Sequence, residues 1–158
     1  MITSAHTATL FLEWIMSSLC TTPVLRVLIL GTSRDAAVGL DDDAEWHHIC
    51  VTWSSTNGDY EFFKDGVSVG SGSGFNSGGH ITSGGTTVIG QDQDEVGGGF
   101  DSTQAFVGDL TQVSVWGAVL SASDIQAQAS TCHISQGSVN WWSQFKDNVH
   151  GGVVIVEP

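Results

Sequence analysis

Oxygen-bearing side chains crowd the segment 90–108, and they are the first indication of chemistry in this chain. Asp92, Asp94, Glu95 and Asp101 supply carboxylates, Gln104 adds an amide, and the segment contains no Lys or Arg. Ca²⁺ takes about six to eight oxygen ligands from carboxylates, amide and backbone carbonyls, and water. The segment therefore predicts a calcium-binding loop. The alternative interpretation is an acidic, solvated, glycine-rich surface loop that holds no ligand.

The same carboxylates do not predict catalysis. A glycosidase needs two carboxylates about 5–5.5 or 6.5–9.5 Å apart, and Asp92 and Asp94 are compatible with such a separation. Its general acid also needs an apolar setting that raises the pKa, whereas this loop is polar and rich in glycine. His47 and His48 fall on opposite faces of a predicted strand, and the other histidines are scattered along the chain. We therefore expect no enzymatic activity.

Acidic residues dominate the whole chain, which has four Lys and Arg against 17 Asp and Glu and a formal net charge of −13. Affinity for nucleic acid comes largely from cationic contacts to phosphates, so this charge excludes a nucleic-acid partner. It also disfavours anionic lipid surfaces and favours contacts that a cation bridges. Glu13 and Arg26 interrupt the apolar runs, so no membrane-spanning helix is expected.

Cys20, Cys50 and Cys132 allow at most one disulfide within the chain and leave one thiol over. This count is consistent with a secreted domain that carries one disulfide. A secretory signal is not visible, because residues 1–30 lack a basic segment before their apolar run.

The elements that must position the acidic loop are predicted to be strands. The length of 158 residues fits one domain, and the abundance of Gly, Ser and Thr favours β structure. The clearest strand is 46–53, whose alternation puts His48 and Cys50 on one face and Ile49 and Val51 on the other. Because both faces are partly apolar, this segment is predicted to be an interior strand of a sandwich.

Further elements follow from alternation and turn residues. The Asn57-Gly58 and Asp65-Gly66 pairs are typical of hairpin turns, because type I′ turns need positive φ at both central positions. Ser121 to Asp124 fits a capping box and predicts one short helix that continues to Ala129. Asp41 to Asp43 is interpreted as a turn. The other predicted strands are 8–18, 25–31, 60–64, 67–69, 86–90, 106–116, 138–145 and 153–156, the last returning to the sheet.

A motif within the clearest strand resembles a known family. His48-Ile49-Cys50-Val51-Thr52-Trp53 is similar to the pentraxin signature His-x-Cys-x-Ser/Thr-Trp, and the resemblance covers residues 44–145. It implies an all-β, two-sheet antiparallel jelly-roll sandwich of the concanavalin A-like or laminin G-like kind, with one short helix. Residues 1–158 are then one pentraxin-like domain, whose first part, 1–43, is divergent or lacks strands.

The resemblance also implies a set of calcium ligands. The family's ligands fall on Asp92, the main-chain carbonyl of Gln93, Asp94, Asp101 and the side chain of Gln104. The family more often has Glu where this chain has Asp92 and Asp101, which puts affinity in question because the shorter side chain withdraws its oxygens. An Asp-Asn pair that completes a second calcium site in the family has no counterpart here. One cation is therefore expected rather than two.

The family's disulfide is matched less closely. Cys50 corresponds to one of its cysteines, but the position of the partner falls on Leu12. Cys20 is the candidate substitute, and the partner of Cys132 is left open.

Two functions remain under consideration from the sequence. The first is a calcium-dependent, lectin-like recognition module of a secreted or extracellular protein, in which calcium bridges to an anionic or carbohydrate-type ligand. The alternative is a metal-independent structural or adhesion module that mediates protein contacts. The resemblance allows either a cyclic homo-oligomer or one domain of a larger multidomain protein.

Overall fold

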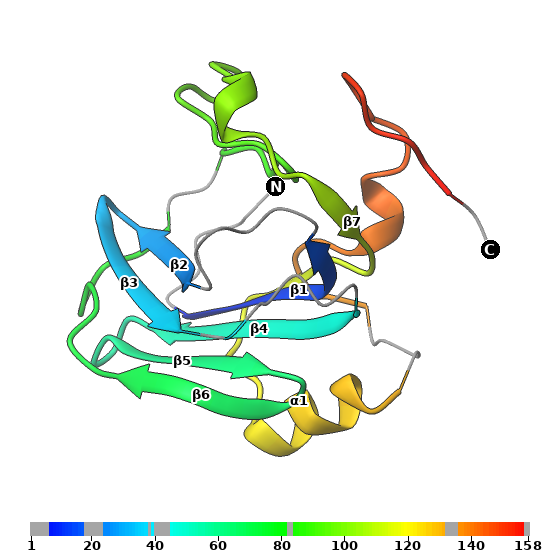
Figure 1. The fold of residues 1–158 in the computed structure, drawn as a ribbon. Helices are drawn as coiled ribbons and strands as arrows, with labels where there is room; N and C mark the ends of the chain where they lie inside the picture. Colours follow the sequence, from blue (N-terminus) through cyan, green and yellow to red (C-terminus); the bar gives the residue numbers. More distant parts are fainter. Residues whose placement is uncertain are drawn as a thin grey trace.

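The computed structural model describes residues 7–17, 24–37, 39, 45–81, 84–131 and 136–156. Within them two antiparallel sheets form (Figure 1): a larger one in the order β6-β5-β4-β1-β7, with β8 also paired to β1, and a two-stranded β2-β3 sheet. The elements are β1 (Thr7–Ser17), β2 (Val24–Ile29), β3 (Thr32–Ala37), β4 (His47–Ser54), β5 (Asp59–Lys64), β6 (Val67–Gly72), η1 (Ser102–Gln104), β7 (Gly108–Leu110), β8 (Ser114–Trp116), α1 (Ala122–Ala129) and η2 (Trp142–Gln144). No helix in these ranges is long and apolar enough to cross a membrane.

Strand β4 lies inside the larger sheet and is buried on both faces, as the sequence predicts. On one face Ile49 and Val51 pack with Phe62 of β5 and Ala36 of β3, which joins the two sheets into a sandwich. On the other face Cys50 packs with three side chains from β5, β8 and α1, namely Phe63, Trp116 and Ile125. The predicted all-β sandwich with one short helix is therefore confirmed, although its sheets do not close into a barrel.

Strand β1 joins the two halves of the larger sheet. Along one edge, residues 7–15 pair with β4, with an irregularity between Glu13 and Ile15. Along the other edge, residues 9–11 pair with β8 and residues 15–17 with β7. The first strand of the sequence is thus a central strand of the fold.

The β2–β3 hairpin makes cation–π contacts with two aromatic rings outside it. Arg34 of β3 places its guanidinium carbon 4.9 Å from the ring centre of Phe75 and 5.8 Å from that of Tyr60. Such contacts are attractive because the ring faces carry negative potential. Strand β3 was not predicted, because its sequence, Thr-Ser-Arg-Asp-Ala-Ala, carries little apolar signal.

The two predicted hairpin turns differ in outcome. Asp65 and Gly66 have φ of 52° and 77°, so they form the type I′ turn that joins β5 to β6. The connection from β4 to β5 instead spans residues 55–58, and among them positive φ occurs at Gly58 alone. The hairpin predicted at Asn57-Gly58 is therefore confirmed, because β4 and β5 pair antiparallel across this turn, but the turn is not of type I′.

Three predicted strands are corrected by the structure. Residues 86–90 form no strand. The segment 106–116 is divided into β7 and β8 because Gln112 adopts a φ of 57°, which breaks extended backbone, and the break lies opposite the irregularity in β1. Residues 138–145 contain a single bridge, Asn140 to Val115, and then η2.

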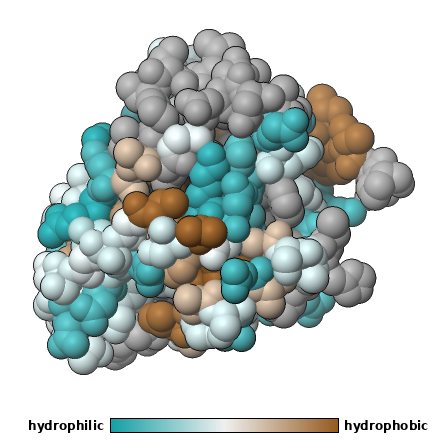
Figure 2. All heavy atoms as spheres, turned by 60° about the horizontal axis from the view of Figure 1, so that its bottom comes forward, coloured by the Kyte–Doolittle hydropathy of each residue, from teal (hydrophilic) through white to brown (hydrophobic). Residues whose placement is uncertain are grey.

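The C-terminal prediction was also wrong. Residues 153–156 are not a strand and do not return to the sheet. Their side chains are exposed, from 47% for Ile155 to 81% for Val156. Figure 2 shows this apolar segment standing out at the right-hand edge of the molecule.

Helix α1 is confirmed with its cap. The Ser121 side chain accepts a hydrogen bond from the Asp124 backbone, and the Asp124 carboxylate accepts one from the Ser121 backbone. Ile125, fully buried, then packs the helix onto the face of the sheet that carries Cys50. The cap therefore fixes where the helix begins, and Ile125 fixes which face it covers.

Candidate functional site

The acidic loop 90–108 stands at the top of the view in Figure 1, above the strands, and includes η1. Its two ends are held together because the Phe106 backbone N–H donates to the Gly90 carbonyl at 2.9 Å. Within it, a reciprocal backbone pair between Glu95 and Gly98 makes a tight turn. The loop is thus a closed unit with its own hydrogen bonds.

Glycine is favoured where the loop folds back on Asp94. Gly99 has a φ of 71°, and a Cβ at this position would lie 2.7 Å from the Cβ of Asp94. Both facts favour glycine here, because other residues rarely adopt positive φ and a Cβ at this distance would force Asp94 or the backbone to shift.

Gln93 uses its side chain to hold the loop. Its amide oxygen accepts from the Gly97 N–H at 2.9 Å, and its amide nitrogen donates to the Thr86 carbonyl at 3.2 Å. Because the side chain is occupied, the main-chain carbonyl is the Gln93 oxygen that suits a cation.

Asp101 caps the short helix η1. One oxygen, Oδ1, accepts from both the backbone N–H and the hydroxyl of Thr103, each at 2.8 Å. These bonds, the backbone one first, hold the pKa of the Asp101 carboxyl below its ordinary value of 3.8. Gln104 ends η1, and its N–H donates to the Asp101 carbonyl at 3.0 Å, so the two predicted ligands share one turn.

Asp92 and Asp94 lie exposed in the first half of the loop. Asp92 accepts at Oδ1 from the Gln93 N–H at 2.9 Å, which orients its carboxylate. Within the described ranges neither carboxylate is in an ion pair with Lys, Arg or His. Their negative charge is therefore not neutralised by those neighbours.

The five predicted ligands fall into two separate groups. Asp92, Gln93 and Asp94 are consecutive, whereas Asp101 and Gln104 belong to the η1 turn. Across the described part of the chain, no three His, Cys, Asp or Glu side chains gather closely enough to hold a metal ion. The assignment of these residues as ligands stays a prediction.

Of the three cysteines considered for a disulfide, Cys50 lies in the described part of the chain and the other two lie outside it. Cys50 is fully buried on β4, directly opposite Phe11 of β1, and Leu12 lies opposite Ile49. Cys20 and Cys132 lie outside the described residues, as does the predicted Asp41 to Asp43 turn. The Cys20–Cys50 disulfide stays a prediction.

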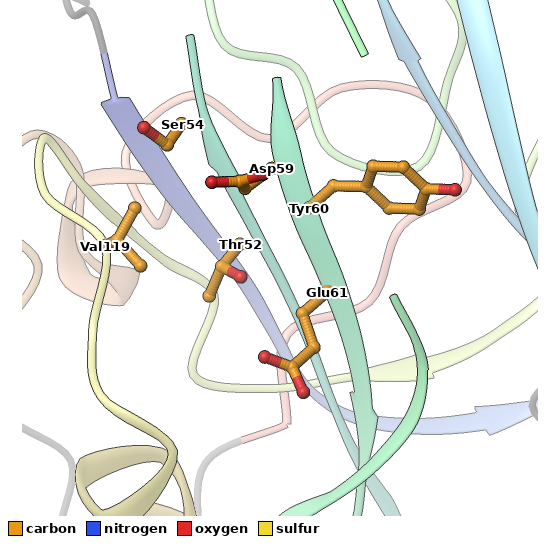
Figure 3. A pocket seen from close by; sticks show the side chains of 6 residues that line it. All are labelled: Thr52, Ser54, Asp59, Tyr60, Glu61 and Val119. Atoms are coloured by element: carbon orange, nitrogen blue, oxygen red, sulfur yellow. The ribbon is translucent and has the colours of Figure 1, made fainter. Parts of the chain in front are cut away.

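A second polar site, which the sequence did not reveal, lies on the larger sheet. Thr52 and Ser54 of β4, with Asp59 and Glu61 of β5, line a cleft of about 320 Å³ closed on one side by Val119 (Figure 3). Alternation would place each pair on one face, but only the strand register shows that the two pairs face the same way.

Comparisons with known proteins agree with the geometry. The model of the Pentaxin family matches residues 24–158. Neuronal pentraxin-2 of Homo sapiens is 43% identical over 110 residues, which is 70% of this chain and 26% of that protein. A Rattus norvegicus relative, the sushi, von Willebrand factor type A, EGF and pentraxin domain-containing protein 1, is 39% identical over 116 residues, or 72% of this chain and 3% of its own.

The solved structures extend this likeness to the fold. The native heptameric SAP-like pentraxin from Limulus polyphemus superimposes with a TM-score of 0.76 at 22% identity, covering 89% of this chain and 78% of its own. The chain spans about a quarter of the length of the neuronal pentraxins that it matches. The family model, the relatives and the sandwich fold together show that this chain belongs to the pentraxin (Pentaxin) family.

Proposed function

We propose that residues 1–158 form a calcium-dependent, lectin-like recognition module of a secreted or extracellular protein. The observation that carries this proposal is the pattern of hydrogen bonds in the loop 90–108. Bonds within the loop use the Gln93 side chain and one oxygen of Asp101. The carboxylates of Asp92 and Asp94 and the second Asp101 oxygen stay exposed for a hard cation. Membership of the pentraxin family supports the same assignment.

The donor set fits calcium in its chemistry. Asp92, Asp94 and Asp101 supply carboxylate oxygens, and the Gln93 carbonyl and Gln104 amide supply neutral ones. Ca²⁺ takes about six to eight oxygens, so these donors leave positions for oxygens of a ligand. A cation held there would reconcile an acidic protein with an anionic or carbohydrate-type ligand. We propose one ion, held by this loop alone.

Calorimetric titration of Ca²⁺ into chelator-treated protein, with thermal unfolding in parallel, tests the proposal. At a calcium concentration of about 100 times Kd the folded state gains about 2.7 kcal/mol. For a domain of this size that gain raises Tm by roughly 5–10 °C. Absence of both binding heat and a Tm shift at millimolar Ca²⁺ would refute the proposal.

A charge-matched pair of variants identifies the site. Asp92→Ala with Asp94→Ala is expected to abolish the calcium-induced Tm shift. Asp59→Ala with Asp147→Ala removes the same charge from exposed positions outside the loop and is expected to retain the shift. Equal loss in both double variants would show a general charge effect instead of a site.

The competing function is a metal-independent structural or adhesion module. One relative supports this function: the match covers only 3% of that protein, whose name includes several other domain types. This favours a role as one domain among many. Under this function, the Asp92→Ala and Asp94→Ala variant would keep both its stability and its partner binding in calcium. A cyclic homo-oligomer is the other proposed setting, since the solved relative is described as heptameric.

We propose no catalytic role for the loop. A general acid of a glycosidase needs an apolar setting that raises its pKa, whereas Asp92 and Asp94, the two candidate carboxylates, are exposed in a polar loop.

A further inference from the structure

The turn between β4 and β5 contains an asparagine that is followed directly by a glycine, Asn57-Gly58. Asn57 is exposed, and Gly58 is buried with a φ of 67°. Within the described residues neither the Asn57 side chain nor the Gly58 N–H makes a hydrogen bond. The side-chain amide and the backbone nitrogen that follows it are therefore both available for reaction.

These two groups can react with each other because they are neighbours along the chain. The Gly58 nitrogen, after losing its proton, attacks the side-chain carbonyl carbon of Asn57, and a cyclic imide forms as ammonia leaves with a proton. Water then opens the imide. Cleavage of the bond to the side-chain carbon gives aspartate, and cleavage of the bond to the main-chain carbon gives isoaspartate. Glycine favours the attack because it has no Cβ to shield its nitrogen.

The other three asparagines of the chain lack this combination of features. Asn76 and Asn140 precede serine and tryptophan, and the side-chain amide nitrogen of each donates a hydrogen bond. Asn148 is exposed like Asn57, but the β-branched Val149 follows it and shields the attacking nitrogen. Asn57 is therefore the asparagine at which the reaction is most favoured, and Asn148 is its matched control.

Two successive backbone hydrogen bonds join this turn to the chain that leaves β6, and together they are called here the 57–75 contact. The Gly74 N–H donates to the Asn57 carbonyl at 2.9 Å. The Phe75 N–H donates to the Gly58 carbonyl at the same distance, 2.9 Å. Figure 1 shows both segments at the left-hand end of the β4–β6 meander. A Cβ on Gly58 would lie 2.3 Å from the Phe75 nitrogen, so the contact leaves no room for additional atoms.

The two products of the reaction affect the 57–75 contact differently. Aspartate keeps the main chain as it was and adds a negative charge. Isoaspartate inserts a methylene group into the main chain and converts the carbonyl that accepts from Gly74 into part of a free carboxylate. Phe75 is fully buried, and its own carbonyl accepts the Trp53 indole N–H at 2.7 Å. Isoaspartate at position 57 therefore disturbs a contact that continues into the core.

We propose that Asn57 is a site of spontaneous deamidation, and that its isoaspartate product releases Gly74 and Phe75 from the β4–β5 turn. The reaction consumes only water and needs neither an enzyme nor calcium. Its rate rises with pH, because the attacking nitrogen must lose its proton. The fraction of molecules that carry the modification therefore grows with the age of the protein.

Incubation of the folded chain in H₂¹⁸O at mildly alkaline pH, followed by peptide mass spectrometry, tests this modification site. Peptides that contain Asn57 are expected to exchange ammonia for a heavy oxygen roughly tenfold faster than those that contain Asn148. Asn57→Gln is expected to abolish the exchange at this position, because the longer side chain does not form the same ring. Equal rates at Asn57 and Asn148, or no heavy oxygen at position 57, would refute the site.

Hydrogen exchange and thermal unfolding separate the two products. Chains that carry isoaspartate, identified by methylation with an isoaspartyl methyltransferase, are expected to lose exchange protection at the Gly74 and Phe75 amides and to have a lower Tm. Asn57→Asp carries the same added charge on an intact main chain and is expected to keep both the protection and the Tm. Full protection in the isoaspartate form, or an equal loss in Asn57→Asp, would overturn the proposed release.

Discussion

At the residue scale, hydrogen bonds to Asp101 stabilise its carboxylate in the charged form. Its Oδ1 accepts two hydrogen bonds from Thr103, so the charged form is stabilised while Oδ2 stays available. Replacing Thr103 by Val removes the hydroxyl donor and leaves the backbone donor in place. The pKa of Asp101 is then expected to rise toward 3.8, as measured by carboxyl ¹³C NMR, with Ser102→Ala as a control that leaves it unchanged.

The same hydrogen bonds give a pH dependence of known sign. The folded pKa of Asp101 lies below its unfolded value of 3.8, so its contribution to stability is present above pH 3.8. That contribution is lost as pH falls through the folded pKa. Thermal unfolding between pH 5 and the folded pKa should therefore show a smaller pH-dependent loss in Thr103→Val than in the unchanged protein. An equal loss in both would show that the Thr103 hydroxyl does not contribute to the lowered pKa of Asp101.

Trp53 makes the clearest buried polar contact in the core. Its indole N–H donates to the Phe75 carbonyl at 2.7 Å, and both residues are almost fully buried. Trp53→Phe leaves that carbonyl without its partner, which costs about 1–3 kcal/mol, and also leaves unfilled volume. Urea unfolding should show this loss, while Trp142→Phe at a half-buried position should cost less. Equal costs would contradict the importance of the hydrogen bond.

At the scale of elements, the β4–β5 connection depends on a glycine that no side chain can replace. Gly58 and Gly74 have similar φ, 67° and 72°, but a Cβ on Gly58 would lie 2.7 Å from the Phe75 carbonyl oxygen, whereas one on Gly74 meets open space. Gly74→Ala is expected to cost about 1–2 kcal/mol from backbone conformation alone. Gly58→Ala should cost about 1–3 kcal/mol more because of overlap. Equal losses in urea unfolding would show that the neighbouring backbone moves aside.

Strong local signals predicted some elements correctly. The alternation in β4, the Asp65-Gly66 turn and the Ser121 cap each contain within a few residues the information that forms them. Elements whose formation depends on tertiary contacts were predicted wrongly or missed. Residues 153–156 have high strand propensity but lack a partner strand in the described fold. Strand β3 forms from polar residues because it pairs with β2 along its whole length and buries Ala36 against the larger sheet.

The candidate sites also differ in how much of each could be predicted from the sequence. The ligand residues of the loop were assigned through resemblance to the family, but the roles of the Gln93 side chain and of Thr103 emerge only from the folded loop. The polar cleft lined by Thr52, Ser54, Asp59 and Glu61 was missed because alternation alone does not give the register between two strands.

At the scale of the whole molecule, β1 holds the larger sheet together. It pairs with β4 along one edge and with β7 and β8 along the other. Removal of residues 1–17 is therefore expected to expose both edges and to abolish cooperative thermal unfolding, as followed by circular dichroism. A synthetic peptide of residues 7–17 should restore it. A truncated chain that unfolds as sharply as the full one would contradict the central role of β1.

The position of β1 also sets the order in which the chain can fold during synthesis. β1 is synthesised before the strands that it pairs with, which are residues 47–54 on one side and 108–116 on the other. The β4–β6 meander pairs through short turns and closes early, whereas β1 waits for strands made much later. Until Trp116 has been synthesised, the nascent chain carries an open strand edge, so this is the interval in which a chaperone would protect it.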